Sequence, residues 1–582
     1  MKLLVAKIHN FRGIIEQTIS IQNYALLVGA NNAGKSTIID AIRAFYEKDG
    51  FKYKADNDFP LAGSIDSESW IELHYQLTDP ENDSLAAEYQ TPENLLKVRK
   101  YFQTSQKLHD GKTAAGAILG YKTDGTISDE PFYGAKNVQS GKFGDLIYIP
   151  AVSKVDEHAK LSGPSALRDL LTNIMADVVD GSDAYQNLTK SVNEFSNSVR
   201  TRETVDKRSL AGFEDDLNNM LTSWQAKFKL KFSSPSTAEI IKSMLGWEIR
   251  DDCHERAQNI EYFGSGFQRH FIYSLIQLGA RYVPKKSTKK TKDFTPSLNL
   301  VLFEEPEAFL HPPQQEELCR HLVSISENAD WQIISATHSS HFVSRNAERI
   351  PAIIRLQRIK GIVNSFQIKT EDWNKIIDAN QEIKLIADKY PKLKKTMQED
   401  DLKPEMEAVK YFLWLNPDRA SIFFANTVLL VEGQSETALV NKLLDDGKLS
   451  LPHGTYALDC LGKYNIHRFM NLLGALGVQH AVLHDDDDNE NEHKELNQLI
   501  ADSTIQGFTV SIKQIVKNLE TFLSIPSAKS PHRKPQHILY CYTNGSINPD
   551  KIKEFCDLVV SCFPNTEGTQ AMPETDAVST KA

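Results

Sequence analysis

The sequence predicts an α/β fold with two parallel-sheet domains, the first of which contains a helical insertion. At 582 residues the chain is too long for a single hydrophobic core, so two or three domains are expected. Short apolar runs at residues 24–28, 298–303 and 331–335 are typical of buried strands, and the first leads through a glycine-rich turn into a helical pattern at 36–46. A second series of strands begins at residues 427–431, which indicates a second α/β domain.

The composition is that of an ordinary globular protein, with 41% hydrophobic and 25% charged residues. No run of about 18 apolar residues is present, and Lys7 and His9 interrupt the apolar N-terminal residues. We therefore expect neither a membrane span nor a signal peptide. The six cysteines form no CxxC pair, which favours a reducing cytoplasm over a disulfide framework or structural zinc.

The net charge of −11 bears on whether the chain binds nucleic acid. Phosphate contacts need local Lys and Arg side chains, but a basic groove can lie on an acidic protein, and carboxylates that hold metals add to the negative total. Five lysines fall in the loop at 284–292. This loop either contacts DNA or is a solvated surface loop, and the sequence does not decide between the two.

The order of the remaining elements sets the expected domain boundaries. Runs at 70–77 and 146–150 predict further strands of the first domain, and polar, helix-length segments at 165–179 and 184–199 predict the helical insertion. Another helix is expected at 266–282. The expected parts are 1–155 and 236–370 for the first domain, 156–235 for an insertion that forms a dimerisation arm, 371–420 for a helical connection, 421–545 for the second domain, and 546–582 for a C-terminal segment with a disordered tail.

A phosphate-binding pattern follows the strand at 24–28. The segment Gly29-Ala-Asn-Asn-Ala-Gly34-Lys35-Ser36 fits GxxxxGK[ST] and lies between a strand and a helix. In such a loop, glycines let backbone N–H groups surround a β-phosphate, the lysine places a charge at the β/γ-phosphates, and the serine offers a hydroxyl to Mg²⁺. A turn that binds no phosphate is the alternative. The predicted ATP-binding residues of this loop are Gly29, Asn32, Gly34, Lys35, Ser36 and Thr37.

Two later strands end in residues that suit the same nucleotide. The strand at 298–303 is followed by Glu304 and Glu305, which are placed to hold the magnesium shell and to polarise the attacking water, respectively. His338 ends the strand at 331–335 and is placed to contact the γ-phosphate. Each feature alone could be a surface turn or a structural histidine, but their order after the phosphate-binding loop favours an ATPase.

A fourth segment, Gly264-Ser265-Gly266-Phe267-Gln268-Arg269, precedes a helix and lies upstream of the acidic strand. A Ser-Gly turn at a helix N-terminus suits an anion, although it could simply cap the helix. The segment resembles the ABC signature SGGQ, with Phe267 in place of the second glycine, so Ser265, Gly266 and Gln268 are predicted to bind nucleotide.

Together with Asn10-Phe11-Arg12-Gly13, these motifs resemble the ABC ATPases of the RecF, Rad50 and SMC group. In that group the signature of one subunit closes over the nucleotide of another, so the resemblance implies a homodimer or a higher homo-oligomer. The separation of Lys35 and Glu304 leaves room for a helical arm but not for a long coiled coil.

The second domain carries acids at the ends of its predicted strands. Glu432 and Gly433 follow the strand at 427–431, Glu436 lies near the start of the next helix, and the apolar run at 481–483 leads into four consecutive aspartates at 485–488. Strand-end acids converge at the carboxyl edge of a parallel sheet, and Mg²⁺ or Mn²⁺ suits such oxygen ligands. A solvated acidic loop is the alternative for the aspartate run alone.

Further along, Glu520 offers another acid and Lys534 a cation. Several carboxylates and a lysine fit two-metal phosphodiester hydrolysis, in which one metal activates water, the other stabilises the leaving oxygen, and the lysine neutralises charge on the phosphate.

Glu432-Gly433 with Asp485-x-Asp487 resembles the Toprim fold of topoisomerases, primases and nucleases. An ABC ATPase followed by such a domain is similar to the OLD (overcoming lysogenization defect) nucleases over most of residues 1–545, and Leu461-Gly462-Lys463 resembles the Gly-Lys turn of that family. The resemblance implies that Lys534 assists at the phosphate and leaves open whether Asp486 or Asp488 binds metal. The implied ligands of two metals are Glu432, Glu436, Asp485, Asp487 and Glu520.

The expected function is a DNA endonuclease that needs ATP and Mg²⁺ or Mn²⁺ and is gated by nucleotide state. The resemblance further implies anti-phage defence, with a retron reverse transcriptase and its msDNA as one specific partner. A DNA-repair ATPase similar to RecF, whose second domain binds DNA without cutting it, is the first alternative. A primase or topoisomerase that uses the same metals is the second, although no stretch clearly provides the DNA-gate domain of a topoisomerase. Whether ATP activates or inhibits cleavage stays open.

Overall fold

The computed structural model divides the chain into two compact units. The first unit contains Met1–Ala151 and Thr291–Ala582, and the second contains Val152–Lys290. The residues that the structure describes are 1–47, 50–134, 141–151, 182–204, 208–222, 226–230, 245–250, 257–258, 260–282, 294–344, 347–396, 403–487 and 491–564, with the single residues 171, 236 and 239.

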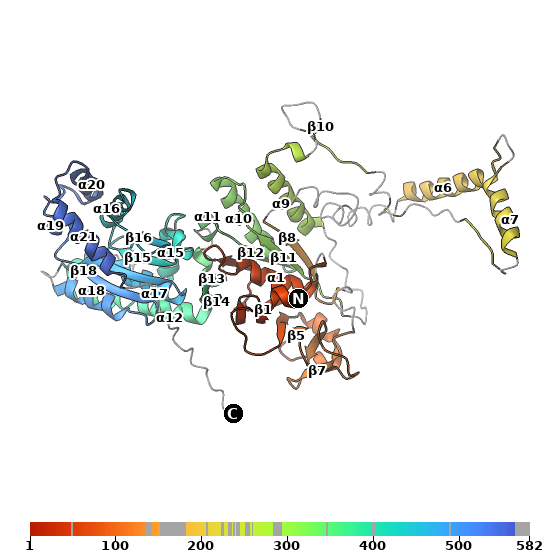
Figure 1. Ribbon diagram of the computed structural model, residues 1–582, viewed down its shortest axis with the longest axis horizontal. Coiled ribbons are helices and arrows are strands. Elements are labelled where there is room, and N and C mark those ends of the chain that lie inside the picture. Colours follow the sequence, from red (N-terminus) through yellow and green to blue (C-terminus); the bar gives the residue numbers. More distant parts are fainter. Residues whose placement is uncertain are drawn as a thin grey trace. The chain divides into compact units, whose positions relative to one another are not determined.

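The N-terminal part of the first unit contains an antiparallel sheet and a mostly parallel sheet (Figure 1). The antiparallel sheet has the order β2-β1-β4-β5-β6-β7, and the other has the order β14-β13-β3-β12-β11-β8, with β14 antiparallel at its edge. Helix α1 (Lys35–Tyr46) contributes Ile38, Ile42 and Phe45 to a core that both sheets share. The strands of the antiparallel sheet are β1 (Lys2–Phe11), β2 (Ile14–Ser20), β4 (Ser69–Gln76), β5 (Leu95–Gln103), β6 (Ile118–Tyr121) and β7 (Ile127–Pro131).

The strands of the parallel sheet confirm the predicted apolar runs. They are β3 (Tyr24–Val28), β8 (Asp145–Ile149), β11 (Asn299–Glu304), β12 (Trp331–Ala336) and β13 (Ile353–Ile359), with β14 (Ile362–Gln367) beside β13. Every residue of β3 and β12 is buried, as expected for strands covered on both faces. Phe303 pairs with Ser335, and Ser335 with Leu26, so β11, β12 and β3 end at the same edge. Helices α10 (Pro312–Ser326) and α11 (Ser340–Ser344) complete this part.

A four-stranded parallel sheet of order β16-β15-β17-β18 forms the second domain. Helices α17 and α18 lie on one face, and α16, α20 and α21 lie on the other (Figure 1). Helix α21, in the segment after residue 545, contributes Phe555 and Val559 to the same core as Leu429 and Leu483. The elements are β15 (Thr427–Val431), α16 (Gln434–Asp445), β16 (Thr455–Asp459), α17 (Ile466–Ala475), β17 (Gln479–Asp485), α18 (Asn491–Asp502), β18 (Thr509–Ile515), α19 (Leu519–Phe522), α20 (Lys534–Thr543) and α21 (Pro549–Ser561).

Several helices lie between β14 and β15 in the chain, where the sequence predicts a helical connection. It consists of α12 (Thr370–Asn380), α13 (Ile383–Lys389), α14 (Pro391–Thr396), α15 (Pro404–Trp414) and the short η7 (Arg419–Phe423). Glu407 of α15 is fully buried and accepts hydrogen bonds from Arg468, Lys410 and Asn380. A buried polar network therefore fixes these helices to α17.

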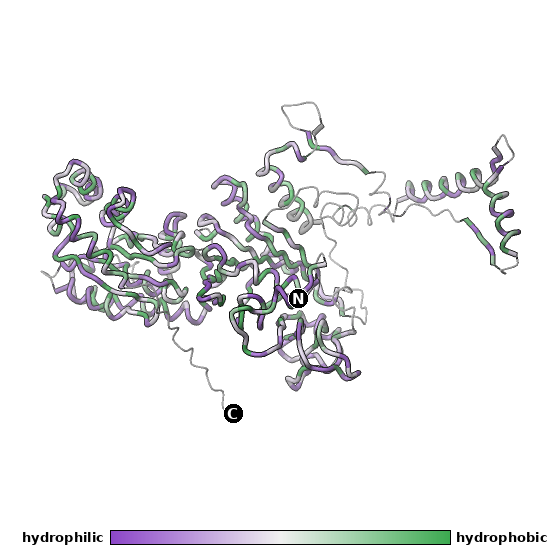
Figure 2. Tube along the Cα trace, viewed as in Figure 1, coloured by the Kyte–Doolittle hydropathy of each residue, from purple (hydrophilic) through white to green (hydrophobic). Residues whose placement is uncertain are grey.

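The second unit contains α6 (Asp183–Thr201), α7 (Leu210–Leu221), the short strands β9 (Ile249–Arg250) and β10 (Ala257–Gln258), and α9 (Ser265–Tyr282). Helices α6 and α9 confirm the predictions at 184–199 and 266–282. Hydrophilic and hydrophobic residues alternate within the turns of α6, as in an amphipathic helix (Figure 2). The lysine-rich loop at 284–292, Asp488 and the C-terminal tail lie outside the described residues.

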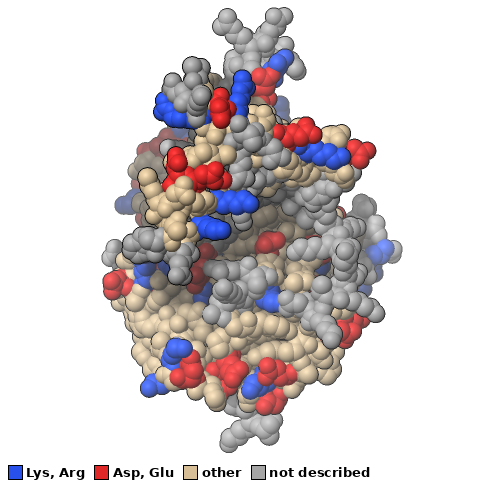
Figure 3. Space-filling view, turned by 90° about the vertical axis from the view of Figure 1, so that its right-hand side faces the viewer, with Lys and Arg blue, Asp and Glu red and all other residues tan. Residues whose placement is uncertain are grey.

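Figure 3 shows that acidic and basic side chains of the described residues are interspersed on the face it draws. The described residues therefore form no single acidic surface on this face, although the chain has a net charge of −11. Among the helices that the structure describes, none combines the length and the hydropathy needed to cross a bilayer.

Candidate nucleotide site and metal centre

The phosphate-binding loop connects β3 to α1 and depends on its glycines. Gly29 and Gly34 have φ of 141° and 106°, and Asn32 has φ of 62°. A Cβ at Gly34 would lie 2.7 Å from the Val363 side chain, and one at Gly29 would collide with the carbonyl oxygen of Leu356. Backbone conformation and close packing therefore both require glycine at these two positions. Ser36 and Thr37 lie in the first turn of α1, where Ser36 is exposed and Thr37 is half-buried.

Lys35 lies inside this loop with its side chain almost fully buried. Its Nζ donates to the carbonyl oxygens of Gly29 at 2.8 Å and Ala30 at 3.0 Å, and it lies 3.4 Å from Nδ1 of His338. Burial lowers the pKa of Lys35 to about 8, although Glu305 and Glu307 oppose this shift. Lys35 and His338 are thus adjacent, as predicted for two groups that contact the same phosphate.

Two acids that follow β11, Glu305 and Glu307, lie close to His338. Oε1 of Glu305 lies 3.6 Å from Nε2 of His338, and Oε1 of Glu307 accepts a hydrogen bond of 2.6 Å from the backbone N–H of His338. Burial and the charge of Lys35 lower the pKa of His338, so a neutral imidazole is favoured. Glu305 has φ of 44°, a conformation that few non-glycine residues adopt.

Two residues of this site were missed by the sequence analysis. Glu307 fixes the His338 backbone, and its only local signal was its place two residues after the predicted pair. Tyr148 of β8 donates a hydrogen bond of 3.0 Å to Oε2 of Glu304, while the guanidinium of Arg43 lies 3.5 Å from the centre of the Tyr148 ring. Tyr148 is far from Glu304 in sequence, and only the pairing of β8 with β11 brings them together.

The residues predicted as a signature lie in the second unit at the start of α9. Ser265 is the first residue of this helix, Gly266 follows it, and Nε2 of Gln268 donates to the carbonyl oxygen of Phe263 at 2.8 Å. The rings of Phe267 and Phe263 are stacked with their centres 4.6 Å apart. The large side chain in place of the second glycine therefore packs locally against Phe263, two residues before the helix begins.

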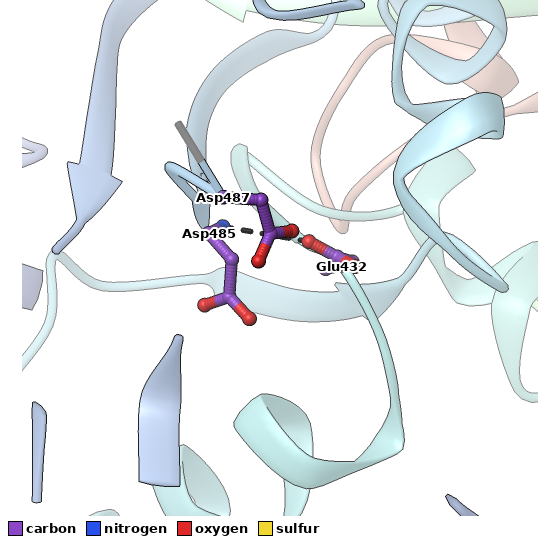
Figure 4. Close-up of side chains that lie close together, drawn as sticks. All are labelled: Glu432, Asp485 and Asp487. Carbon is purple, nitrogen blue, oxygen red and sulfur yellow. Dashed lines mark hydrogen bonds between the residues drawn. The ribbon is translucent and has the colours of Figure 1, made fainter. Parts of the chain in front are cut away.

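The metal centre predicted for the second domain contains three convergent carboxylates. Glu432 follows β15, and Asp485 and Asp487 lie at the end of β17, the neighbouring strand. One carboxylate oxygen from each residue lies within 4.8 Å of the others, and the backbone N–H of Asp485 donates to Glu432 at 3.4 Å (Figure 4). Glu436 is buried beside them, and its Oε2 accepts a hydrogen bond of 3.0 Å from the N–H of Gly433.

The carboxylates perturb one another because they are buried together. Burial, with Glu432, Glu436 and Asp487, raises the pKa of Asp485 to about 9. Burial and the charge of Glu432 raise the pKa of Glu436 to about 7. Oδ1 of Asp485 is buried without a hydrogen-bond partner in the described residues. An all-oxygen cluster whose negative charge lacks compensation fits a hard divalent cation such as Mg²⁺ or Mn²⁺.

Lys463 is a further residue of this centre, which the sequence analysis noted only as part of a Gly-Lys turn. Its side chain is 3% exposed, and its Nζ donates to the carbonyl oxygens of Asp485 at 2.6 Å and Asp486 at 3.3 Å. The same Nζ lies 3.6 Å from Oδ2 of Asp487. Lys463 therefore holds the aspartate turn in place and partly balances its charge.

The two remaining residues predicted for this site, Glu520 and Lys534, form an ion pair with each other. Nζ of Lys534 lies 3.3 Å from Oε1 of the buried Glu520. Burial opposes the charge of Lys534, but Glu520, Asp485 and Glu436 outweigh it and raise its pKa. Lys534 therefore interacts electrostatically with the metal centre. Neither Glu520 nor Glu436 belongs to the group of three convergent carboxylates.

Comparisons with known proteins identify two domains in the chain. The family model described as "AAA ATPase domain" matches residues 1–113 and 81–343, and the model "Overcoming lysogenization defect protein-like, TOPRIM domain" matches 423–487. The two domains imply that the chain uses a nucleotide and a divalent metal.

The chain is 26% identical to the Old nuclease of Escherichia phage P2, with 90% of this chain and 86% of that protein covered. It is 23% identical to the endonuclease GajA of Bacillus cereus strain HuB5-5, with 81% and 73% covered. The SMC head domain from Thermotoga maritima is similar at a TM-score of only 0.30 and 14% identity, with 64% of this chain and 100% of that chain covered. Because the AAA ATPase model spans more than half of the chain, the chain belongs to the AAA ATPase domain family, and it carries in addition an OLD-like TOPRIM domain.

Proposed function

We propose that this protein is a metal-dependent DNA endonuclease regulated by its own ATPase domain. The observation that carries the proposal is the cluster of Glu432, Asp485 and Asp487 at the carboxyl edge of the second parallel sheet. The names of the relatives support nuclease activity, since one is an Old nuclease and another an endonuclease.

Glu432, Asp485 and Asp487 would hold the first divalent cation, and Glu436 and Glu520 would complete the site for a second. Bound Mg²⁺ or Mn²⁺ would activate water and stabilise the leaving oxygen of the phosphodiester. Lys463 keeps the turn at Asp485 and Asp487 in position through its bonds to two carbonyl oxygens. The cationic Lys534 is placed beside these carboxylates, where it would neutralise charge on the scissile phosphate.

For the ATPase site, we assign Lys35 to the β- and γ-phosphates and Ser36 with Glu304 to Mg²⁺. Glu305 orients the attacking water, and His338 contacts the γ-phosphate. Two further neighbours support these roles, because Tyr148 orients Glu304 and Glu307 fixes the backbone of His338. The predicted nucleotide contacts of the loop and signature are Gly29, Asn32, Gly34, Thr37, Ser265, Gly266 and Gln268.

The signature residues would act on the nucleotide of a second copy of the chain, so we propose a homodimer or higher homo-oligomer. We also propose that the protein works in the cytoplasm, in anti-phage defence. A retron reverse transcriptase with its msDNA is one partner consistent with the family resemblance.

Plasmid nicking with Mg²⁺ or Mn²⁺ tests the proposal directly. Wild type is expected to nick or linearise supercoiled DNA, and Asp485→Ala is expected to lose this activity. Asp502→Ala, which removes an exposed aspartate of α18 in the same domain, is the matched control and is expected to cut normally. Equal cleavage by Asp485→Ala and wild type, or no cleavage by wild type with any nucleotide, contradicts the nuclease assignment and favours a DNA-repair ATPase. Incorporation of nucleotides on a single-stranded template would instead identify a primase.

A further inference from the structure

Arg355 is a buried cation at the point where the ATPase sheet meets the second domain. It lies on β13 with 2% of its surface exposed. Its guanidinium donates to the carbonyl oxygens of Gly477 at 3.0 Å, Ala425 at 3.1 Å, Leu476 at 3.2 Å and Phe423 at 3.3 Å. All four acceptors belong to the second domain or to the short helix that enters it.

These contacts replace the carboxylate that a buried arginine usually has as a partner. No ion pair involves Arg355 in the part of the chain that the structure describes, and burial lowers its pKa to about 10. Leu476 is the C-terminal cap of α17, and Phe423 is the last residue of η7. The carbonyl groups at a helix C-terminus carry partial negative charge, so they can stabilise a guanidinium without an acid. Five donors in a rigid fork allow one side chain to hold two separate segments.

The four acceptors lie next to elements that lead to the metal centre. Ala425 precedes β15, which ends one residue before Glu432, and Gly477 precedes β17, which ends at Asp485. Leu476 caps the C-terminus of α17, and this helix begins at Ile466, three residues after Lys463. A displacement of Arg355 would therefore act on the starts of both strands that carry the convergent carboxylates.

On its other side, Arg355 is adjacent to the phosphate-binding loop. It pairs with Val28, the last residue before Gly29. The next residue, Leu356, packs its carbonyl group against Gly29, and Val363 of β14 packs against Gly34. The β13–β14 hairpin therefore lines the loop that is predicted to close on nucleotide.

The same hairpin makes a second contact with the second domain. The ring of Phe366 packs against Gly477 and lies perpendicular to the Phe508 ring, with centres 5.9 Å apart. Beside the hairpin, a cavity of about 370 Å³ is lined by Ala30 and Asn31 of the loop and by Pro452 and Gln479 of the second domain. Because this cavity separates the loop from the second domain, the β13–β14 hairpin makes the closer contact between the two domains.

We propose that Arg355 is a positioning residue that transmits the nucleotide state of the phosphate-binding loop to the strands that carry the metal ligands. This inference rests on the proposed nuclease function and adds the route by which the ATPase domain regulates it. When the loop closes on nucleotide, β3 and β13 move as a paired unit, and the guanidinium moves the ends of η7 and α17 with them.

The test uses the full-length chain with Arg355→Gln, and with Arg358→Gln as the matched control. Arg358 lies on the same strand but is exposed and donates only to the carbonyl oxygen of Gly361 among the described contacts. Wild type is expected to nick plasmid at rates that differ with and without ATP, because two coupled sites typically change each other's affinity about 5- to 150-fold. Arg355→Gln is expected to bring the ratio of these rates to about one, with ATP hydrolysis retained, while Arg358→Gln keeps the wild-type ratio.

Hydrogen exchange gives a readout that does not depend on cleavage. Addition of ATP is expected to slow exchange at the phosphate-binding loop in all three proteins, but to change it at 427–431 and 479–485 only in wild type and Arg358→Gln. A response of these strands in Arg355→Gln, or none in wild type, overturns the inference even if wild type cuts DNA. Absence of cleavage by wild type contradicts the nuclease function but leaves the exchange comparison decisive for coupling. If Arg355→Gln does not fold, Arg355→Lys carries the same expectations, because a lysine keeps the charge but lacks the planar fork of five donors that reaches all four carbonyl groups.

Discussion

Removing the carboxylate of Glu407 should destabilise the protein far more than removing a carboxylate from an exposed ion pair at the same junction. Glu407 is fully buried between Arg468 and Lys410, with Nε of Arg468 at 3.1 Å and Nζ of Lys410 at 2.9 Å. Glu407→Ala removes the carboxylate that both cations share. Breaking a buried pair in this way typically costs about 3–5 kcal/mol of the free energy of unfolding, because an uncompensated charge stays buried.

Glu495 provides the matched control. It accepts hydrogen bonds from Lys389 and Tyr390 at 2.8 Å each, so it also ties the helical connection to the second domain. The side chains of this pair are 60% and 34% exposed, however, and water and salt screen such pairs so that they contribute little to the free energy of unfolding. The expected difference between Glu407→Ala and Glu495→Ala is therefore several kcal/mol.

Urea denaturation followed by tryptophan fluorescence measures this difference. Trp373 and Trp414 report on the region, since both rings lie within about 6 Å of the Tyr411 ring beside Glu407. Glu407→Ala is expected to lower the unfolding midpoint strongly, and Glu495→Ala only slightly. Equal midpoints for the two variants would show that burial does not set the strength of these contacts, and would refute the reasoning.

Three further predictions concern the ATPase site, the metal centre and acid stability. Lys35→Ala should weaken nucleotide binding in a fluorescent-nucleotide titration, whereas Glu305→Gln should bind ATP but not hydrolyse it; rapid phosphate release by Glu305→Gln would contradict its assigned role. Asp487→Asn should weaken Mn²⁺ binding measured by calorimetry, and chelation of the metal should abolish cleavage by wild type; unchanged affinity would remove Asp487 from the ligand set. Glu72 is buried, which alone would raise its pKa, but hydrogen bonds from His74, Tyr121 and Arg99 lower the pKa well below its usual range. The stability it contributes is thus fully present above the ordinary glutamate pKa and is lost as pH falls below it, so the melting temperatures of wild type and Glu72→Gln should converge in acid; a constant difference down to pH 3 would argue against this role.

The parallel strands and the positions of the motifs were predictable because both depend on local sequence. The apolar runs at 24–28 and 427–431 agree with β3 and β15 residue for residue. Since parallel strands align their carboxyl ends, acids that follow neighbouring strands must meet, as Glu432 and Asp485 do. Lys35 and His338, which follow the neighbouring strands β3 and β12, likewise lie close together.

The rest of the site could not be predicted, because it consists of contacts between distant segments that leave no local pattern. Tyr148 reaches Glu304 through strand pairing, and Arg355 bonds carbonyl groups that any residue could supply. Every residue has a backbone carbonyl group, so the sequence does not indicate which of these groups accept hydrogen bonds from an arginine on an apolar strand. Glu407 and Arg468 likewise meet only through the packing of α15 on α17.

The aspartate run shows how burial changes the meaning of a motif. In the sequence, four consecutive aspartates are compatible with a solvated acidic loop, whose carboxylates would be exposed and would repel one another only weakly in water. The structure instead leaves Asp485 8% exposed, with a buried Oδ1 that lacks a hydrogen-bond partner in the described residues and with Glu432 and Asp487 within 4.8 Å. Such an arrangement is costly unless protons or a cation offset the charge, and the rise in the pKa of Asp485 expresses that cost. A fold gains no stability from grouping buried acids in this way, so the arrangement is better explained by a metal that the protein must bind than by a requirement of folding.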